Sequence, residues 1–242
     1  LEERERELVR MLKNQDHLLS VIAHDLKNAV VNLDQLLGLV VEEEEANFPW
    51  VKEKLGLAKK TSAQLTTQLN DMISWKLAQN EVLKPIKQNI SISKIIDQLT
   101  EQFYSQLSHK HMHLETFMEE DFLVFSDMQM LQSIMRNLVG NAIKYSHPYS
   151  SIIVKAERVI DHRYGSTVKV SVIDHGTGIR SNRLKQLQDG EYDESTVGTL
   201  GERGSGFGLL LCMQLLKKLH TTLNIQSEWE KGSIFSFILP LA

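Results

Sequence analysis

The chain has 242 residues, of which 42% are hydrophobic and 24% charged, as is usual for a globular protein of one or two domains. Its net charge of −4 gives no indication of nucleic acid as a partner. No apolar run reaches the roughly 18 residues that a membrane helix needs, and the single cysteine excludes an intrachain disulfide. Because the chain has no initiator Met and no signal peptide, we expect a cytoplasmic fragment of a longer protein.

Two long helices are predicted in the first third of the chain. Between Leu8 and Val40 the apolar residues recur at alternating spacings of four and three, the heptad pattern of a helix packed lengthwise against others. A short connection around Pro49 leads to a second amphipathic helix at about residues 50–79. The two helices would form an antiparallel hairpin whose apolar seam is half covered. We therefore expect a homodimer in which two hairpins form a four-helix bundle.

His24 is the residue of the first helix that best fits a nucleophile. The heptad register places it opposite the apolar seam, with Asp25 beside it and Asn28 one helical turn further on. A carboxylate that accepts a hydrogen bond from one ring N–H leaves the other ring nitrogen free to attack. His17 has the same heptad position without these neighbours. On spacing alone, an ordinary exposed histidine remains the alternative for His24.

A second domain is predicted to begin at Pro85, where the periodicity changes. Alternation at Ile86–Ile92 indicates a strand, and Ser93 is the expected cap of a helix that ends near His109. The other expected elements are helices at 127–144 and 207–219 and strands at 114–117, 123–125, 152–159, 168–173, 222–227 and 233–239. This mixture of helices, strands and hairpins predicts an α+β sandwich with one sheet and helices on one face.

A patch of amides and a lysine lies on the helix predicted at 127–144. Asn137, Asn141 and Lys144 share one face of that helix. Amide oxygens are suitable ligands for Mg²⁺, and a lysine neutralises phosphate. Two asparagines one turn apart more often form a solvated helix face, which is the alternative for this patch by itself.

Two further patches are rich in glycine. Asp174 ends an apolar strand, where its carboxylate could accept from an exocyclic amine such as that of adenine, although Asp in an ordinary tight turn fits equally well. Gly176 and Gly178 would let the backbone approach a ligand. The third patch leads into the helix at 207–219, whose first N–H groups form an anion site, and its glycines are Gly204, Gly206 and Gly208. It matches neither a P-loop nor a Rossmann fingerprint.

Together with the first helix, these patches resemble the catalytic core of two-component sensor histidine kinases over nearly the whole chain. His24–Asn28 is similar to the H box, Asn137–Ser146 to the N box, and Asp174–Gly178 and Gly204–Gly208 to the two glycine boxes. The resemblance implies a HisKA-type dimerisation and phosphotransfer hairpin at 1–84, followed by an HATPase domain of the Bergerat type at 85–242. It also implies a bacterial origin.

The resemblance implies that His24 is autophosphorylated from Mg-ATP and passes its phosphoryl group to an aspartate on the receiver domain of a response regulator. Asp25 would orient His24 or act as its general base. Asn28 would position water for a reverse phosphatase activity.

In the ATP site, the resemblance implies that Asp174 binds the adenine amino group and that Tyr145 lines the adenine pocket. Asn141 would be the Mg²⁺ ligand with Asn137 supporting it, and Lys144 would meet phosphate or ribose. The triphosphate would be held by the amides around Gly204, Gly206 and Gly208. The polar loop at 189–205 would be a mobile lid.

Three positions depart from the family pattern. Ala29 stands where many H boxes carry proline. No phenylalanine box precedes the lid, because Leu187–Tyr192 offers only a tyrosine. His220-Thr-Thr replaces the usual glycine pair after the last helix, where we expect an effect on a turn.

Two other features have ordinary explanations. His109, His111 and His113 alternate and could share a face for a metal, but a helix-to-strand turn is the better interpretation. Cys212 falls among leucines, so we expect a buried, inert thiol.

Two other functions remain open from the sequence. One is a Bergerat-fold ATPase of the gyrase and MutL kind, but such enzymes carry a glutamate where Asn137 stands and lack the H box. The other is a non-catalytic dimerising scaffold with a degenerate nucleotide site. The intact Asn141, Asp174 and glycines argue against that scaffold.

Overall fold

The computed structural model describes residues 32–33, 53–58, 61–62, 84–161, 165–188, 197–202 and 206–242. By its internal contacts the chain divides into two compact units, Leu1–Ile73 and Ser74–Ala242. The described residues of the first unit are helical. Most of the predicted hairpin, with His24, Asp25 and Asn28, lies outside the described residues, and the domain boundary at 84 and 85 also stays a prediction.

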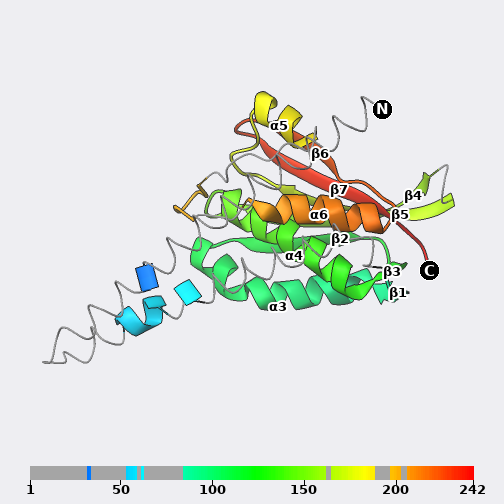
Figure 1. Cartoon of the computed structure of the whole chain (residues 1–242), viewed down its shortest axis with the longest axis horizontal. Helices are drawn as coiled ribbons and strands as arrows, with labels where there is room; N and C mark the ends of the chain where they lie inside the picture. The colour runs from blue at the N-terminus through cyan, green and yellow to red at the C-terminus, as the bar shows by residue number, and fades with distance from the viewer. Residues whose placement is uncertain are drawn as a thin grey trace, which may run out of the picture. The chain divides into compact units, whose positions relative to one another are not determined.

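A five-stranded sheet forms the base of the second unit (Figure 1). Its strands, in order across the sheet, are β2 (His113–Met118), β4 (Ser151–Asp161), β5 (Gly165–Asp174), β7 (Gly232–Pro240) and β6 (Asn224–Glu228). The β2–β4 pair is parallel and the other three pairs are antiparallel. The β4–β5 hairpin confirms the pair of strands predicted around residues 162–165.

A separate two-stranded sheet corrects the prediction of a single sheet. The strands β1 (Lys87–Ser91) and β3 (Leu123–Asp127) pair with each other along their whole length. Asp127 reinforces this pairing, because its Oδ2 accepts a hydrogen bond from the N–H of Ile86 at 2.7 Å. An isolated bridge joins Val124 of β3 to Leu241, which directly follows β7. β1 and β3 form their backbone hydrogen bonds with each other, and the main sheet has five strands.

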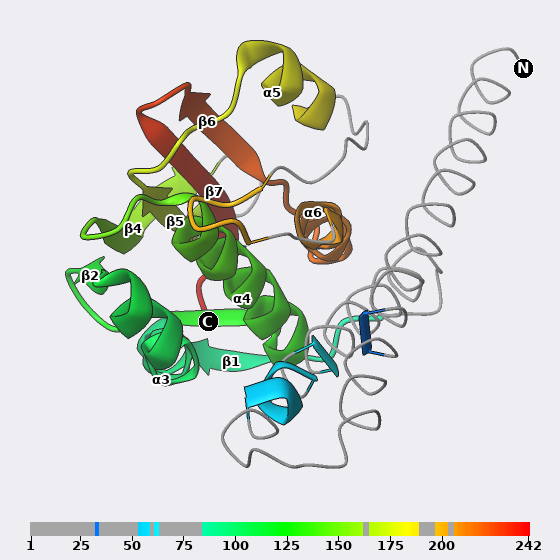
Figure 2. The same cartoon turned by 90° about the vertical axis from the view of Figure 1, so that its left-hand side faces the viewer.

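Three helices cover one face of the large sheet (Figure 2). They are α3 (Ile92–Lys110), α4 (Met128–Tyr145) and α6 (Phe207–Lys218). α4 lies in the middle and contacts both α3 and α6. Among the described residues there is also a short helix, α5 (Ser181–Gln188), which packs near β6. Among the described residues, no helix combines the length and apolar character that crossing a membrane requires.

The N-caps of α3 and α4 can be compared with the helix starts predicted from the sequence. The helix predicted at 127–144 is confirmed as α4, and Asp127 is its N-cap, because its carboxylate accepts from the N–H of Met130 at 2.9 Å. The predicted cap Ser93 is wrong, because Ser91 caps α3 and accepts from the N–H of Lys94 at 3.2 Å. Ser93 lies inside the first turn of that helix.

The core lies between α4 and the sheet. Leu131, Ile134 and Leu138 of α4 have no exposed surface, and neither do Val170 and Val172 of β5. The thiol of Cys212 on α6 is also fully buried, as predicted, and donates to the carbonyl of Ile134 at 3.7 Å. Burial of the α4 face therefore positions its other, polar face for the candidate site.

Candidate functional site

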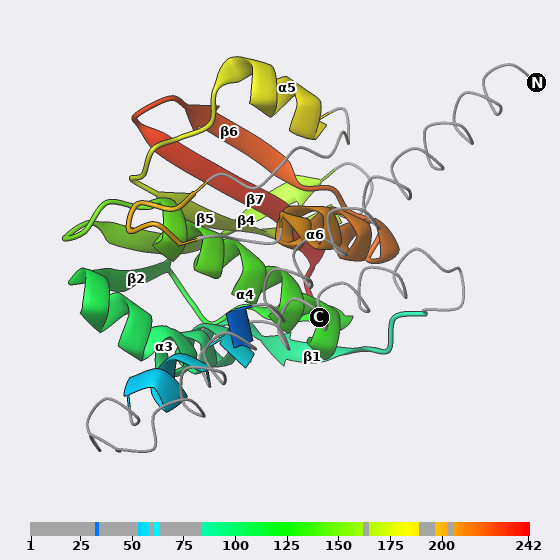
Figure 3. The same ribbon diagram turned by 60° about the vertical axis from the view of Figure 1, so that its left-hand side comes forward.

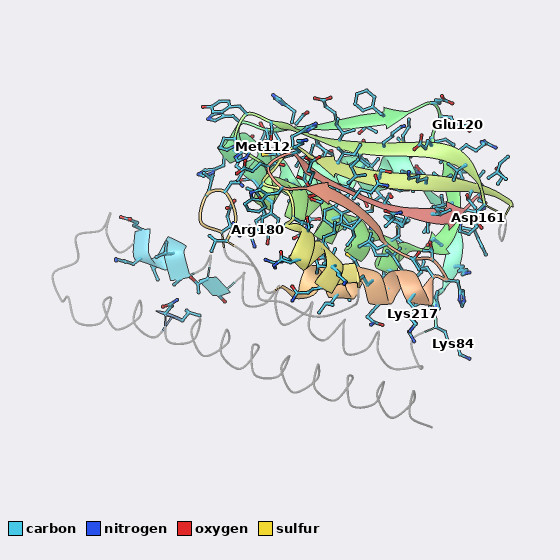
Figure 4. The ribbon with its side chains drawn as sticks, turned by 90° about the horizontal axis from the view of Figure 1, so that it is seen from above. Lys84, Met112, Glu120, Asp161, Arg180 and Lys217 are labelled. Carbon is cyan, nitrogen blue, oxygen red and sulfur yellow. The ribbon has the colours of Figure 1, made fainter. Side chains whose placement is uncertain are left out.

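The end of β5, which carries Asp174, and the end of α4, which carries Lys144 and Tyr145, meet at one end of the sheet through the bridge between Ser146 and Gly176. Arg180, which follows the Asp174–Gly178 turn, and Met112, which follows α3, lie at this end (Figure 4). Asp161 and Glu120 lie at the opposite end of the domain (Figure 4). The β4–β5 hairpin turn is therefore remote from the site.

Asp174 is a buried carboxylate at the end of β5, with 5% of its surface exposed. The N–H groups of Gly176 and Ser233 donate to its Oδ1 at 3.0 and 3.2 Å. Burial raises the pKa of Asp174 above the ordinary aspartate value, because it outweighs the hydrogen bonds that stabilise the charged form. Its Oδ2 takes part in neither of these two backbone hydrogen bonds and is suited to accept from a ligand.

Gly176 joins the Asp174 turn to the end of α4. A Cβ at Gly176 would overlap the carbonyl of Tyr145, so only glycine fits there. The N–H of Thr177 donates to this carbonyl at 3.1 Å, and Ser146 forms a β-bridge with Gly176. The amide patch and the first glycine patch, separate in the sequence, therefore form one structure.

The turn between β6 and β7 supports the Asp174 turn from its other side. Gly178 has a φ of +63°, and a Cβ there would overlap the carbonyl of Glu228. The guanidinium of Arg180 stacks 4.6 Å from the ring centre of Trp229, and the N–H of Ile179 donates to Ser227 Oγ at 2.8 Å. No motif in the sequence indicated these supporting residues.

Asn137 and Asn141 are half-buried on α4, one helical turn apart. The side-chain N–H of Asn137 donates to the carbonyl of Ser133 at 2.9 Å. Its Oδ1 faces the start of α6, where a Cβ added at Gly208 would stand 2.5 Å away. The amide of Asn137 therefore packs against the backbone of Gly208, where a Cβ would clash with it.

The start of α6 has the features of an anion site. Gly206 is its N-cap, with a φ of +74°, and none of the described side chains caps the first N–H groups. Exposed N–H groups at a helix start attract anions such as phosphate. Gly204 lies outside the described residues.

Lys144 and Tyr145 form the last turn of α4. The ammonium of Lys144 donates to the hydroxyl of Tyr145 at 2.8 Å and lies 4.5 Å from its ring centre. Residues 197–202, part of the predicted mobile lid, are bonded to this turn: the N–H of Thr199 donates to the carbonyl of Lys144 at 3.1 Å. This part of the loop is therefore anchored, and we refer to 197–202 as the anchored turn (Figure 3).

The three alternating histidines belong to a helix-to-strand turn, as the better of the two interpretations predicted. His111 is the C-cap of α3 with a φ of +53°, and its ring stacks on Tyr149 with 4.9 Å between centroids. Across the described parts of the chain, no cluster of three or more His, Cys, Asp or Glu side chains could hold a metal ion.

Comparison with known proteins agrees with this geometry. Residues 126–242 match the histidine kinase-, DNA gyrase B-, and HSP90-like ATPase family. The adaptive-response sensory kinase SasA of Synechocystis is 26% identical over all of this chain and 63% of its own length. The phosphate regulon sensor protein PhoR of Haemophilus influenzae is 27% identical over 97% of this chain and 53% of its own length. The chain thus spans between half and two thirds of these curated relatives.

Solved structures share the fold. The histidine kinase AdeS of Acinetobacter baumannii has a TM-score of 0.70 at 16% identity and covers 90% of this chain and 98% of its own. The histidine kinase ThkA in complex with the response regulator TrrA has a TM-score of 0.65 at 18% identity, covering 99% of this chain and 66% of its own. ShkA in complex with AMPPNP reaches 0.65 at 17% identity, covering 94% of this chain and 46% of its own.

Residues 126–242 therefore form an ATPase domain of the family shared by histidine kinases, DNA gyrase B and HSP90. Together with the similarity to the sensory kinases, this domain match supports a sensor histidine kinase catalytic core.

Proposed function

We propose that this chain is an ATP-dependent protein histidine kinase that phosphorylates its own His24. The observation that carries this proposal is the buried Asp174, joined through Gly176 to the turn of α4 that presents Asn141, Lys144 and Tyr145. A buried acceptor at the end of β5 suits the adenine end of a nucleotide, and the glycine-capped start of α6 suits its phosphate end. The family match over residues 126–242 supports ATP as the ligand.

Each part of the nucleotide has matching residues. Oδ2 of Asp174 accepts from the exocyclic amine of adenine, while Oδ1 stays bonded to Gly176 and Ser233. Tyr145 lines the adenine pocket, and Lys144 neutralises phosphate or meets ribose. The triphosphate lies against the N–H groups at the start of α6, around Gly204, Gly206 and Gly208.

The donor set also fits Mg²⁺ held jointly by protein and nucleotide. Asn141 offers an amide oxygen one helical turn from Asn137, and phosphate oxygens supply the remaining charge. Bound Mg²⁺ would neutralise charge on the transferring phosphoryl group. Asn137 supports Asn141 by packing against the backbone of Gly208.

The reaction at His24 is an in-line displacement. A ring nitrogen of His24 attacks the γ-phosphorus, the bond to the β–γ bridging oxygen breaks, and ADP leaves with that electron pair. Asp25 accepts the ring proton or holds the reactive tautomer. The phosphoryl group then passes to an aspartate carboxylate of a response regulator receiver domain, which regenerates His24. Asn28 positions water for the opposing phosphatase reaction.

Two partners follow from this proposal. A second copy of the chain would complete a four-helix bundle with the hairpin at 1–84. A response regulator is the acceptor, and the ThkA–TrrA complex supports this because a protein of the same fold binds such a regulator.

The test is incubation with Mg-ATP that carries a labelled γ-phosphate. Wild type, His24→Gln and the matched control His17→Gln are compared, since both histidines share one heptad position. Acid-labile, base-stable label in wild type and His17→Gln but not in His24→Gln is the expected result. Label that survives in His24→Gln would exclude His24 as the acceptor. Nucleotide binding without label in any variant would instead favour a non-catalytic scaffold.

A further inference from the structure

A buried lysine outside the predicted site carries an additional inference. Lys110, the last residue of α3, has 3% of its surface exposed. Its ammonium donates to the carbonyls of Ile143 and Lys144 at 2.8 and 2.9 Å and to Thr199 Oγ1 at 2.8 Å. It also forms an ion pair with Glu202 Oε1 at 2.6 Å. Lys110 therefore connects three segments: α3, the end of α4 and the anchored turn.

The physical reason for this arrangement lies in the unpaired groups of a helix end. The last carbonyls of α4 lack partners within the helix, and a cation at a helix C-terminus is favourable. A buried ammonium needs a counter-charge, which Glu202 provides. Burial raises the pKa of Glu202, but hydrogen bonds with Lys110 and Leu200 lower it more, and the net pKa lies below the ordinary glutamate value.

The anchored turn is closed by its own hydrogen bonds. The N–H of Gly198 donates to the carbonyl of Glu202 at 2.7 Å, and the N–H of Leu200 donates to Glu202 Oε2 at 2.8 Å. The hydroxyl of Thr199 donates to the carbonyl of Ser146 at 2.7 Å. Glu202 thus holds the turn together with one carboxylate oxygen and holds it to Lys110 with the other.

The turn reaches the candidate site through the side chain of Lys144. A Cβ added at Gly198 would stand 2.7 Å from Cγ of Lys144, so the backbone of the turn packs directly on the lysine stem. The ammonium at the end of this stem lies on Tyr145. A displaced turn would leave the stem of Lys144 without this contact. In Figures 2 and 3 the turn lies beside the end of α4.

We propose that Lys110 and Glu202 are positioning residues for nucleotide binding, which act through the anchored turn on Lys144. This inference rests on the proposed function, because Lys144 matters here as a phosphate or ribose contact. The pair also supplies an anchor within the loop predicted at 189–205, whereas the sequence offers no phenylalanine box before that loop.

The test measures the affinity of the full chain for a fluorescent trinitrophenyl-ATP in the presence of Mg²⁺. Glu202→Gln keeps the shape of the side chain and removes its charge, and we expect it to weaken binding about three- to tenfold. The matched control is Glu120→Gln, which breaks a 2.6 Å ion pair with Arg158 at the opposite end of the domain. That control should bind as wild type does.

A second experiment distinguishes an effect of Glu202 on the position of Lys144 from a general effect on folding. If Glu202 acts through Lys144, Glu202→Gln should weaken binding in wild type but have no added effect in a Lys144→Met background. In the labelling reaction, Glu202→Gln should raise the KM for ATP and leave the rate at saturating ATP unchanged.

Three outcomes would contradict this inference. Equal affinity of wild type and Glu202→Gln would overturn it alone and leave the proposed function intact. An undiminished effect of Glu202→Gln in the Lys144→Met background would show that the pair does not act through Lys144. No binding by wild type would overturn the ATP site and this inference together.

Discussion

Gly176 lies against the main-chain carbonyl of Tyr145 so closely that no side chain fits between them. Through this contact the turn that carries Asp174 and the last turn of α4 become one rigid unit, closed by the β-bridge between Ser146 and Gly176. The carboxylate and the basic side chain proposed to bind opposite parts of one ligand are thereby held at a set distance. The close approach of the backbones at Gly176 and Tyr145 therefore brings these two parts of the site together.

Gly176→Ala should disturb this unit. The new methyl group would meet the rigid backbone of α4, so we expect the free energy of unfolding to fall by about 1–3 kcal/mol and nucleotide affinity to fall with it. Gly140→Ala is the matched control inside α4, where a Cβ would lie 3.5 Å from the ring of Phe103, an ordinary contact. That control should raise stability by about 0.8–1 kcal/mol, because alanine is the better helix former. Urea unfolding of both variants measures the difference, and a stable Gly176→Ala would contradict the rigid contact.

Asp174→Asn should separate binding from stability. The amide oxygen can keep the hydrogen bonds from Gly176 and Ser233, while the amide N–H₂ replaces the acceptor Oδ2 with a donor. We expect loss of ATP binding with an unchanged or higher melting temperature, since a buried charge is removed. Isothermal titration with Mg-ATP and thermal unfolding measure the two effects. Unchanged affinity would remove Asp174 from the adenine contact.

The pH dependence of binding should follow the ionisation of Asp174. Its folded pKa lies above the ordinary value of 3.8, so the carboxylate takes up a proton at a higher pH than an exposed aspartate does. Affinity for ATP should therefore fall as the pH decreases through this raised pKa. A titration of Kd between about pH 4 and 8 measures this effect.

The same shift has the opposite consequence for folding. Because the folded state holds the proton more tightly, Asp174 favours folding most below the unfolded pKa and loses this contribution as the pH rises through the folded pKa. The melting temperature of Asp174→Asn relative to wild type should thus increase with pH. A difference that does not change with pH would contradict the raised pKa.

Strong local patterns made much of the second unit predictable. The strands predicted at 152–159 and 168–173 and the helix predicted at 127–144 appear in the structure as β4, β5 and α4. Helix α5 was not predicted, because Ser181–Gln188 is mostly polar and offers little apolar periodicity. The choice between Ser91 and Ser93 as the cap of α3 also depends on distant partners: Asp121 binds the hydroxyl of Ser91 and the N–H of Ser93.

The candidate site residues could be recognised in the sequence from glycine, amide and carboxylate motifs. The residues that hold them in place, such as Lys110 and Ser233, could not. Lys110 donates hydrogen bonds to residues that are 33 and 89 positions further along the chain, and no local sequence pattern predicts these contacts. Ser233 reaches Asp174 because the two residues are opposite each other in the register of β5 and β7. Such contacts depend on how strands and helices pair, which requires the tertiary structure.

His220 gives a last prediction, on the turn where the usual glycine pair is replaced. It follows α6 with a φ of +63°, a left-handed conformation that disfavours residues with a Cβ. His220→Gly should relieve this strain and raise the free energy of unfolding by about 0.5–1 kcal/mol, after allowance for the more flexible unfolded chain. His109→Gly is the matched control, because His109 is exposed in the last turn of α3 and glycine there should lower stability by a few tenths of a kcal/mol. Chemical unfolding of both variants should therefore give shifts of opposite sign, with autophosphorylation at saturating ATP unchanged. A destabilised His220→Gly would mean that the histidine ring contributes more to this turn than the backbone strain takes away.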